Sequence, residues 1–216
     1  MANMSQRYDC SDPAERATGL AAAKSAIRRG ALVVLPTDSA YAIACDAFRT
    51  TATAALRAAK GRPSDAALPV LIATPGVVDA LTYALPQVGR DFTAALWPGP
   101  LTLIAKQQPS LAWDVDGSDS VAIRMPLHPV ALELLELTGP LAATGANYSG
   151  MPVPLTADDA QAQVGEAVAV YLDAGTMDPA RASAVVDVTA SPPILVRPGS
   201  VSASHLQGIC TDLIIG

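Results

Sequence analysis

The chain has 216 residues, of which half are hydrophobic, and a formal net charge of −6 at pH 7. This length and apolar content can bury a core without disulfides, and three widely spaced cysteines fit neither a disulfide framework nor a zinc site. The acidic charge excludes a generally basic nucleic-acid surface, and the apolar runs are too short to cross a membrane. Because the N-terminus also lacks a secretory signal pattern, we expect a cytoplasmic protein without membrane contact and with weak or no direct nucleic-acid binding.

Caps and apolar runs predict alternating helices and strands in the first half of the chain. Asp12 and Pro13 can cap and start a helix over residues 14–29, with Gly30 just past its end. An apolar strand follows immediately, at residues 31–35. The further elements expected here are helices over 50–60, 77–83 and 87–96 and strands over 68–73 and 101–106.

The second half of the chain is richer in strands. Residues 121–123 predict a short strand that ends in Arg124. The other predicted elements are helices over 129–137 and 158–164 and near Ser204, and strands over 141–144, 168–172, 184–188 and 194–196. No repeat and no linker separates two domains, so the pattern predicts one α/β or α+β unit with helices on at least one face of the sheet.

Polar side chains follow the first buried strand directly. Thr37, Asp38, Ser39 and Tyr41 place hydroxyls and a carboxylate just after its end. Open α/β sheets bind ligands at such an edge. Lys60 and Arg62 flank a glycine and form a compact cationic turn suited to phosphate or carboxylate oxygens. Together these residues predict a polar small-molecule ligand with an anionic group.

Two later strands also end in arginine, at Arg124 and Arg197. A single arginine at a strand end is usually a solvated residue. If these strands are neighbours, however, four cations converge on one site with enough donors for a di- or triphosphate. Residues 143–150 combine small side chains with Asn147, which allows close approach to a ligand but by itself is more typical of an ordinary turn. No dinucleotide fingerprint and no P-loop is present, so a nucleotide must be bound in another way.

Seven motifs, in this order along the chain, resemble the YrdC family. They are PTDSAY (36–41), KGRP (60–63), LWPGPLT (96–102), VAIRMP (121–126), ATGANYSG (143–150), SAVVD (183–187) and VRPG (196–199). The resemblance implies one YrdC-like domain over residues 1–216, with a core at about 22–201 and a twisted mixed β-sheet flanked by helices. It looks like the short form, without the extra C-terminal domain of longer relatives.

The resemblance further implies a nucleotidyltransferase, an L-threonylcarbamoyl-adenylate synthase. Such an enzyme converts L-threonine, bicarbonate and ATP into threonylcarbamoyl-AMP and pyrophosphate, the first step toward threonylcarbamoyl-adenosine in tRNA. Its product would pass to a downstream tRNA-modifying transferase. ATP would be a substrate, with Mg²⁺ carried by its phosphates and by waters rather than by a protein metal site.

Roles for individual residues follow from the same resemblance. Lys60, Arg62, Ser64, Ser120, Asn147 and Arg197 would bind ATP, and Thr37, Arg124, Thr144 and Ser183 would bind the amino acid. Arg124 would take the carboxylate of the amino acid. Lys60 and Arg62 are the catalytic candidates, because adenylation needs an in-line attack on the α-phosphorus while cations neutralise the charge that grows on pyrophosphate.

Five positions depart from the family pattern. Ser39 stands where the family usually has threonine, Ala42 and Ala44 stand where it has glycine, Gly145 where it has serine and Ala184 where it has threonine. The last two positions have lost a side-chain hydroxyl, and they keep alternatives open. Because hydroxyls of this kind discriminate between substrates, one alternative is a diverged paralogue that adenylates or carbamoylates another amino acid or amine. Another is a non-catalytic RNA- or ribosome-binding module, against which the acidic charge argues because non-specific RNA affinity is largely electrostatic. Residues 109–119 are a candidate lid or an ordinary surface loop.

Overall fold

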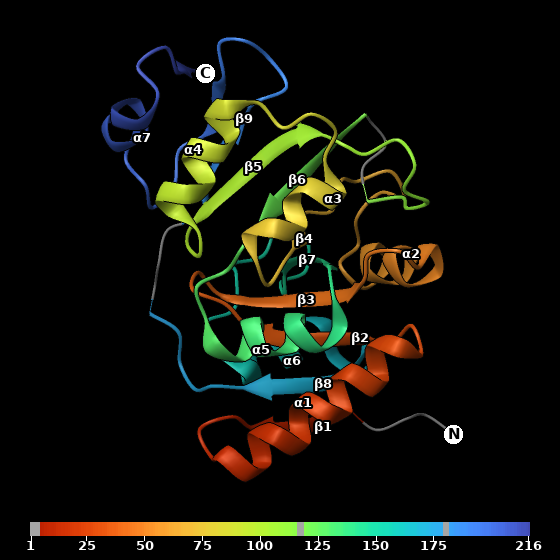
Figure 1. Ribbon diagram of the computed structural model, residues 1–216. Coiled ribbons are helices and arrows are strands. Elements are labelled where there is room, and N and C mark those ends of the chain that lie inside the picture. Colours follow the sequence, from red (N-terminus) through yellow and green to blue (C-terminus); the bar gives the residue numbers. More distant parts are fainter. Residues whose placement is uncertain (1–4, 116–118, 179–181) are drawn as a thin grey trace.

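The computed structural model describes residues 5–115, 119–178 and 182–216 (Figure 1). Within these ranges, one eleven-stranded sheet has the order β1-β8-β2-β3-β7-β4-β6-β5-β9-β10-β11. The strands are β1 (Gln6–Asp9), β2 (Leu32–Pro36), β3 (Tyr41–Asp46), β4 (Val70–Leu71), β5 (Leu101–Lys106), β6 (Ser120–Arg124), β7 (Leu141–Gly145), β8 (Val168–Asp173), β9 (Ala184–Asp187), β10 (Ile194–Arg197) and β11 (Ile214–Ile215).

The sheet is mixed, as expected. β2 pairs parallel with β8 and antiparallel with β3, and β5 pairs antiparallel with β6 and parallel with β9. The helices are α1 (Pro13–Arg28), α2 (Thr50–Ala59), α3 (Val78–Leu81), α4 (Gln87–Leu96), α5 (Pro129–Thr138), α6 (Ala157–Val164) and α7 (Ala203–Ile209), with short 3₁₀ turns at Pro75–Val77 and Gly165–Ala167. The predicted α/β class, with a mixed sheet flanked by helices, is confirmed.

The core lies on both faces of the sheet. In β2, Val33 and Leu35 pack into one apolar cluster with α1 and α5, whereas Leu32 and Val34 pack into a larger cluster on the other side. Alternate residues of a strand point to opposite faces, so a strand covered on both faces must be apolar throughout. That is why the LVVLP run of β2 is buried at every position.

Several element boundaries differ from those predicted. The strand expected over 68–73 is hydrogen-bonded as a strand only at β4, and the helix expected over 77–83 ends at Leu81. The sequence analysis did not predict β1, β3 or β11. β3 is a strand because β2 and β7 pair with it on both sides, and that pairing is a tertiary effect rather than a local preference.

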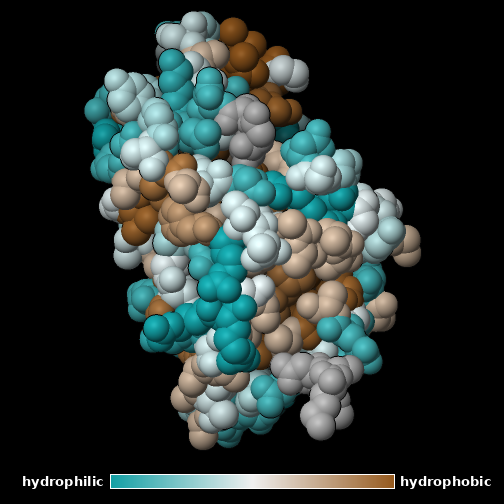
Figure 2. Space-filling view, turned by 90° about the vertical axis from the view of Figure 1, so that its right-hand side faces the viewer, coloured by the Kyte–Doolittle hydropathy of each residue, from teal (hydrophilic) through white to brown (hydrophobic). Residues whose placement is uncertain are grey.

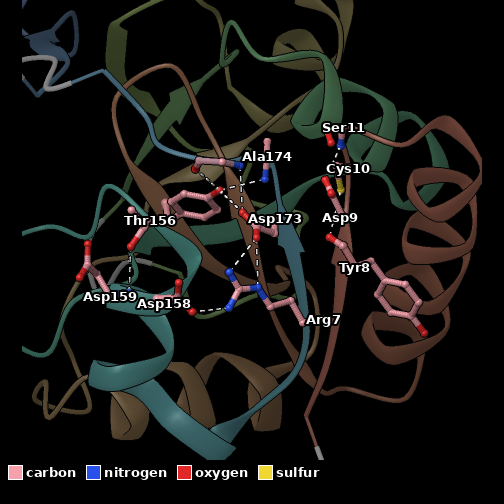
Figure 3. A network of polar contacts seen from close by, with 12 residues as sticks. Arg7, Tyr8, Asp9, Cys10, Ser11, Thr156, Asp158, Asp159, Asp173 and Ala174 are labelled. Atoms are coloured by element: carbon pink, nitrogen blue, oxygen red, sulfur yellow. Dashed lines mark hydrogen bonds and ion pairs between the residues drawn. The ribbon is translucent and has the colours of Figure 1, made fainter.

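A polar network fastens the N-terminal strand to the rest of the sheet (Figure 3). Arg7 of β1 forms ion pairs with Asp173 of β8 and Asp158 of α6. Asp173 Oδ1 also accepts a hydrogen bond of 3.0 Å from the Tyr41 hydroxyl of β3, and the amide of Ala174 donates to that hydroxyl at 2.9 Å. The network therefore holds four elements together beside the start of β3.

The surface combines polar and apolar residues. Figure 2 shows the side of the molecule that lies on the right of Figure 1, where hydrophilic residues surround a hydrophobic area near the centre. Single exposed apolar residues are normal for folded domains. Among the helices of the described ranges, none is long and apolar enough to span a membrane.

Candidate active site

A cavity of about 470 Å³ lies over one face of the sheet. Its lining includes Ala122 and Arg124 of β6, which share one face of the sheet because they alternate, and residues 143–145 of β7. It also includes Thr37 and Ser39, which directly follow β2, and Arg124 of β6 contacts Ser39. The site therefore combines a face of the sheet with the strand end that the sequence analysis pointed to. The volume suits a drug-sized or nucleotide-sized ligand.

The cavity brings together most of the residues that the sequence singled out. Its lining contains Thr37, Lys60, Arg62, Arg124, Thr144, Asn147, Ser183 and Arg197. Two predicted residues lie outside it. Ser64 is exposed in the segment after Arg62, and Ser120 begins β6 at the end opposite Arg124. Their binding of ATP remains a prediction.

Lys60 is buried at the end of α2, with only 2% of its surface exposed. Its ammonium donates hydrogen bonds to the carbonyl of Gly145 and, at 2.5 Å, to the carbonyl of Asn147; Asn147 Oδ1 is a third acceptor at 3.3 Å. An ammonium has three donors, so Lys60 fixes residues 145–147 at the end of β7, called the β7 turn below. It also offers the cavity a positive charge. Burial, with a smaller contribution from Arg62, lowers the pKa of Lys60 to about 8.

The turn after Lys60 depends on glycine. Gly61 has φ +62°, and a Cβ there would lie 2.3 Å from the Tyr148 hydroxyl oxygen. The amide of Ser149 donates to the Lys60 carbonyl at 2.9 Å. Since side-chain residues rarely adopt this backbone conformation, Gly61 allows the cationic turn and the 147–150 turn to pack against each other.

Arg124 is 8% exposed and is held by three different groups. Its Nε donates to the Gly99 carbonyl and its Nη1 to Ser39 Oγ, both at 3.2 Å, and its Nη2 lies 2.7 Å from Asp38 Oδ2. The last contact is an ion pair whose angle does not allow a hydrogen bond, which leaves both atoms buried without one. Buried polar atoms are nearly always hydrogen-bonded, so Nη2 of Arg124 is a donor that an oxygen of an anionic ligand can satisfy.

A hydroxyl pair links β5 and the start of β9 at the opposite wall. Thr102 and Ser183 are buried, and their hydroxyls lie 2.8 Å apart. Arg197 donates to the Ser183 carbonyl from Nε at 3.3 Å and from Nη2 at 3.0 Å. The sequence analysis missed Thr102 as a lining residue. Its available signal was a hydroxyl within an otherwise apolar strand.

The two positions that lack the family's hydroxyl lie on opposite faces of the sheet. Gly145 lines the cavity, and a Cβ there would meet Asn147 Oδ1 at 2.8 Å and Val153 at 3.3 Å. Ala184 is fully buried in the larger apolar cluster, whereas its neighbours Ser183 and Val185 line the cavity. Of the two positions, only 145 therefore faces a ligand. The idea that Ala184 removes a substrate-facing hydroxyl is corrected by the two-residue period of the strand.

Among the residues that the structure describes, no group of three or more His, Cys, Asp or Glu side chains is placed to hold a metal ion. The lining residues are cations, hydroxyls, one amide and apolar groups. Cations and hydroxyls of this kind suit the oxygens of an anionic ligand.

The fold and the cavity define a mixed α/β protein with a cationic, hydroxyl-lined small-molecule site. The family model Sua5_yciO_yrdC, described as "Telomere recombination", matches residues 25–199. The chain belongs to the Sua5/YciO/YrdC family, which confirms the resemblance seen in the sequence.

Similarity over most of this chain is found with bacterial and archaeal proteins. A Mycobacterium tuberculosis protein with a provisional threonylcarbamoyl-AMP synthase name is 46% identical over 207 residues, which cover 95% of each chain. The threonylcarbamoyl-AMP synthase of Pyrococcus abyssi is 34% identical over 191 residues, 88% of this chain and 56% of the relative. The structure of P. abyssi Sua5 complexed with L-threonine matches with a TM-score of 0.88 at 31% identity, over 99% of this chain and 62% of that chain.

Proposed function

We propose that this chain is an L-threonylcarbamoyl-adenylate synthase, an enzyme that makes threonylcarbamoyl-AMP and pyrophosphate from L-threonine, bicarbonate and ATP. The observation that carries the proposal is one cavity that combines four cationic side chains, Lys60, Arg62, Arg124 and Arg197, with the hydroxyls of Thr37 and Ser183. Cations suit a triphosphate and a carboxylate, and hydroxyls suit a polar amino acid. The names of the relatives and the threonine complex of the P. abyssi protein support the same substrates.

The reaction requires two bond-forming steps. The threonine nitrogen attacks bicarbonate and water leaves, which produces an N-carboxylate. One oxygen of that carboxylate then attacks the α-phosphorus of ATP, and the bond to the β-phosphate oxygen breaks to release pyrophosphate. In this chain, Arg124 would hold the α-carboxylate of threonine, while the charges of Lys60 and Arg62 would stabilise the departing pyrophosphate.

Mg²⁺ fits this proposal as a companion of ATP. The described cavity lining contains no carboxylate, so phosphate oxygens and waters would be its ligands. When bound, it would supply charge neutralisation at the phosphates. The product is a reactive mixed anhydride, so an acceptor such as a tRNA-modifying transferase would have to take it up. A cytoplasmic location remains a prediction.

Pyrophosphate release tests the function directly. We expect release from ATP and bicarbonate that depends on L-threonine within a panel of amino acids led by threonine and serine, with the adenylate confirmed by mass. Omission of bicarbonate should abolish release. Release with a different amino acid alone would instead identify a diverged paralogue. No release together with tight, salt-sensitive RNA binding would identify an RNA-binding module.

Two variants test substrate choice. One changes position 145 of β7, which faces the cavity, and the other changes position 184 of β9, which faces the core. Gly145→Ser adds a hydroxyl to the cavity wall and requires the Asn147 side chain to shift, because a Cβ at residue 145 would lie 2.8 Å from its Oδ1. One hydrogen bond of about 0.5–1.5 kcal/mol from the new hydroxyl corresponds to roughly a two- to tenfold rise in kcat/KM for threonine relative to other amino acids. Ala184→Thr is the matched control. It buries a hydroxyl in the core, so it should lower the free energy of unfolding by about 1–3 kcal/mol and leave the preference unchanged.

The same two variants show whether glycine at position 145 is a neutral change or an adaptation to another substrate. If Gly145→Ser lowers the use of threonine relative to another amino acid, glycine at this position is part of a pocket built for that other substrate. An equal change of preference in both variants would contradict the placement of Ala184 in the core. Steady-state kinetics with competing amino acids and chemical denaturation supply the two measurements.

A further inference from the structure

A buried arginine outside the cavity joins two surface segments that are distant in sequence. Arg57 lies in the last turn of α2 and is only 3% exposed. Its Nε donates to the carbonyl of Ala66 at 2.8 Å, and its Nη2 donates to the carbonyl of Asp114. Its Nη1 lies 3.3 Å from Asp114 Oδ2. One guanidinium therefore bridges residues 62–68 and residues 111–115.

Residues 111–115, on one side of the Arg57 bridge, make further contacts. Thr53, one turn before Arg57 on α2, donates a hydrogen bond to Asp114 Oδ1. Trp113 stacks on Phe48 with ring centroids 5.5 Å apart and an interplanar angle of 10°, and its Nε1 donates to Gln107 Oε1 at 2.8 Å. Residues 111–115 are thus anchored to α2 and to the end of β3, which argues against a mobile lid over this part of the predicted 109–119 segment.

Residues 62–68, on the other side of the Arg57 bridge, include a residue that lines the cavity. The amide of Arg62 donates to the Arg57 carbonyl at 2.9 Å, and the amide of Leu68 donates to the Val115 carbonyl at 2.5 Å. Arg62 lines the cavity. The segment that begins with Arg62 is therefore tied at its start by the backbone of Arg57, in its middle by the guanidinium at Ala66, and at its end by residue 115.

Stability alone is a weak reason for such an arrangement. A buried ion pair is often no better for stability than apolar residues of similar size, whereas a guanidinium can fix several acceptors in one geometry. Asp114 is half exposed, with 46% of its side chain accessible, so the pair is not fully sealed from water. Positioning of two segments is the role that the geometry favours.

We propose that Arg57 is a positioning residue for the nucleotide, because it holds the 62–68 segment and with it Arg62 at the cavity. The inference rests on the proposed function, since it takes the triphosphate to be the partner of Arg62. Arg57 does not line the cavity, so its effect is exerted through the loop and not by contact with substrate.

The kinetic test uses Arg57→Gln, which removes the charge and the fork but keeps a polar side chain. We expect KM for ATP to rise about tenfold, the effect of one to two lost hydrogen bonds, with KM for threonine within about twofold of the parent value. Asp114→Asn keeps the backbone carbonyls of residues 66 and 114 as acceptors for Arg57, so it should raise KM for ATP less than Arg57→Gln does. The matched control is Arg90→Gln, which removes an exposed ion pair with Asp79 and should change neither KM.

The structural test is hydrogen exchange of the unliganded protein. Arg57→Gln should accelerate exchange of the amides of residues 62–68 and leave the amides of residues 148–153 as in the parent. Parallel rises in both KM values, or unchanged KM for ATP in a folded variant, would overturn the proposal. If Arg57→Gln does not fold, Asp114→Asn decides the question by the same two measurements.

Failure of the proposed function would be recognisable separately. In that case the parent protein releases no pyrophosphate with threonine. ATP affinity measured by calorimetry and the exchange of residues 62–68 then test Arg57 without turnover. Weaker ATP binding together with faster exchange in Arg57→Gln would support positioning, and parent-like values of both would refute it.

Discussion

Replacement of Arg124 by lysine is expected to lower kcat/KM for threonine about a hundredfold, as the loss of a charge-assisted hydrogen bond in a buried site would do. The guanidinium contacts Gly99, Ser39 and Asp38 in three directions. An ammonium is a single point charge and cannot hold these groups while it also receives a carboxylate in a planar, two-point contact. Arg124→Lys therefore keeps the positive charge but loses the planar, two-point contact with the carboxylate.

A substrate analogue shows whether Arg124 acts on the carboxylate. The parent enzyme should strongly prefer threonine over threoninamide, which lacks the carboxylate, and Arg124→Lys should lose most of that preference. Arg90→Lys, at an exposed arginine of the surface pair with Asp79, is the matched control and should behave as the parent. An unchanged preference in a folded Arg124→Lys protein would remove Arg124 from carboxylate recognition.

Lys60→Met should weaken ATP binding by about 1.5–3 kcal/mol, the range for a hydrogen bond to a charged group, which corresponds to roughly 10- to 150-fold in Kd. A phosphate oxygen would receive this bond in place of Asn147 Oδ1, which is the most distant of the three acceptors at 3.3 Å. Methionine keeps the length and the apolar stem of the side chain but removes the positive charge. It also deprives the carbonyls of Gly145 and Asn147 of their donor. Calorimetric titration with ATP measures the loss, and an unchanged Kd would exclude Lys60 from the phosphate site.

The pH dependence of ATP binding should reflect the titration of the Lys60 ammonium. The pKa of Lys60 in the free protein is about 8, and a bound polyphosphate favours the charged form and raises that pKa. Affinity should therefore be highest below pH 8 and should fall as the pH rises through 8 toward the pKa of the complex. Lys60→Met should show a flat profile over this range. A parent profile that is equally flat would contradict the assignment.

Much of the fold could be predicted because its signals are local. Asp12 caps α1 by accepting hydrogen bonds from the amides of residues 14 and 15, and this signal was readable from Asp12-Pro13. β2 was recognisable as an unbroken apolar run. β3 and the two-residue extent of β4 were not predictable, since their strand character depends on partners that lie far away in the sequence.

The candidate site could be predicted in part. The eight predicted residues that line the cavity lie in motifs with a chemical reason to bind anions or hydroxyls. Ser64 and Ser120 lie outside it, because nearness in sequence to a lining residue does not place a neighbour in the cavity. Thr102 was missed because a hydroxyl in a strand has no recognisable function until Ser183 is placed beside it.

The sequence by itself determined the family, the mixed α/β class and the anionic character of the ligand, because capping, apolar runs and ordered cationic motifs are local properties of the chain. Only the tertiary structure decided which side of each strand faces the ligand, and hence that Gly145 lines the cavity while Ala184 lies in the core. It also decided that Lys60 is bonded to the β7 turn and that Arg57 joins residues 62–68 to 111–115. These contacts join residues up to 87 positions apart, and strand pairing and burial, not local preference, bring them together.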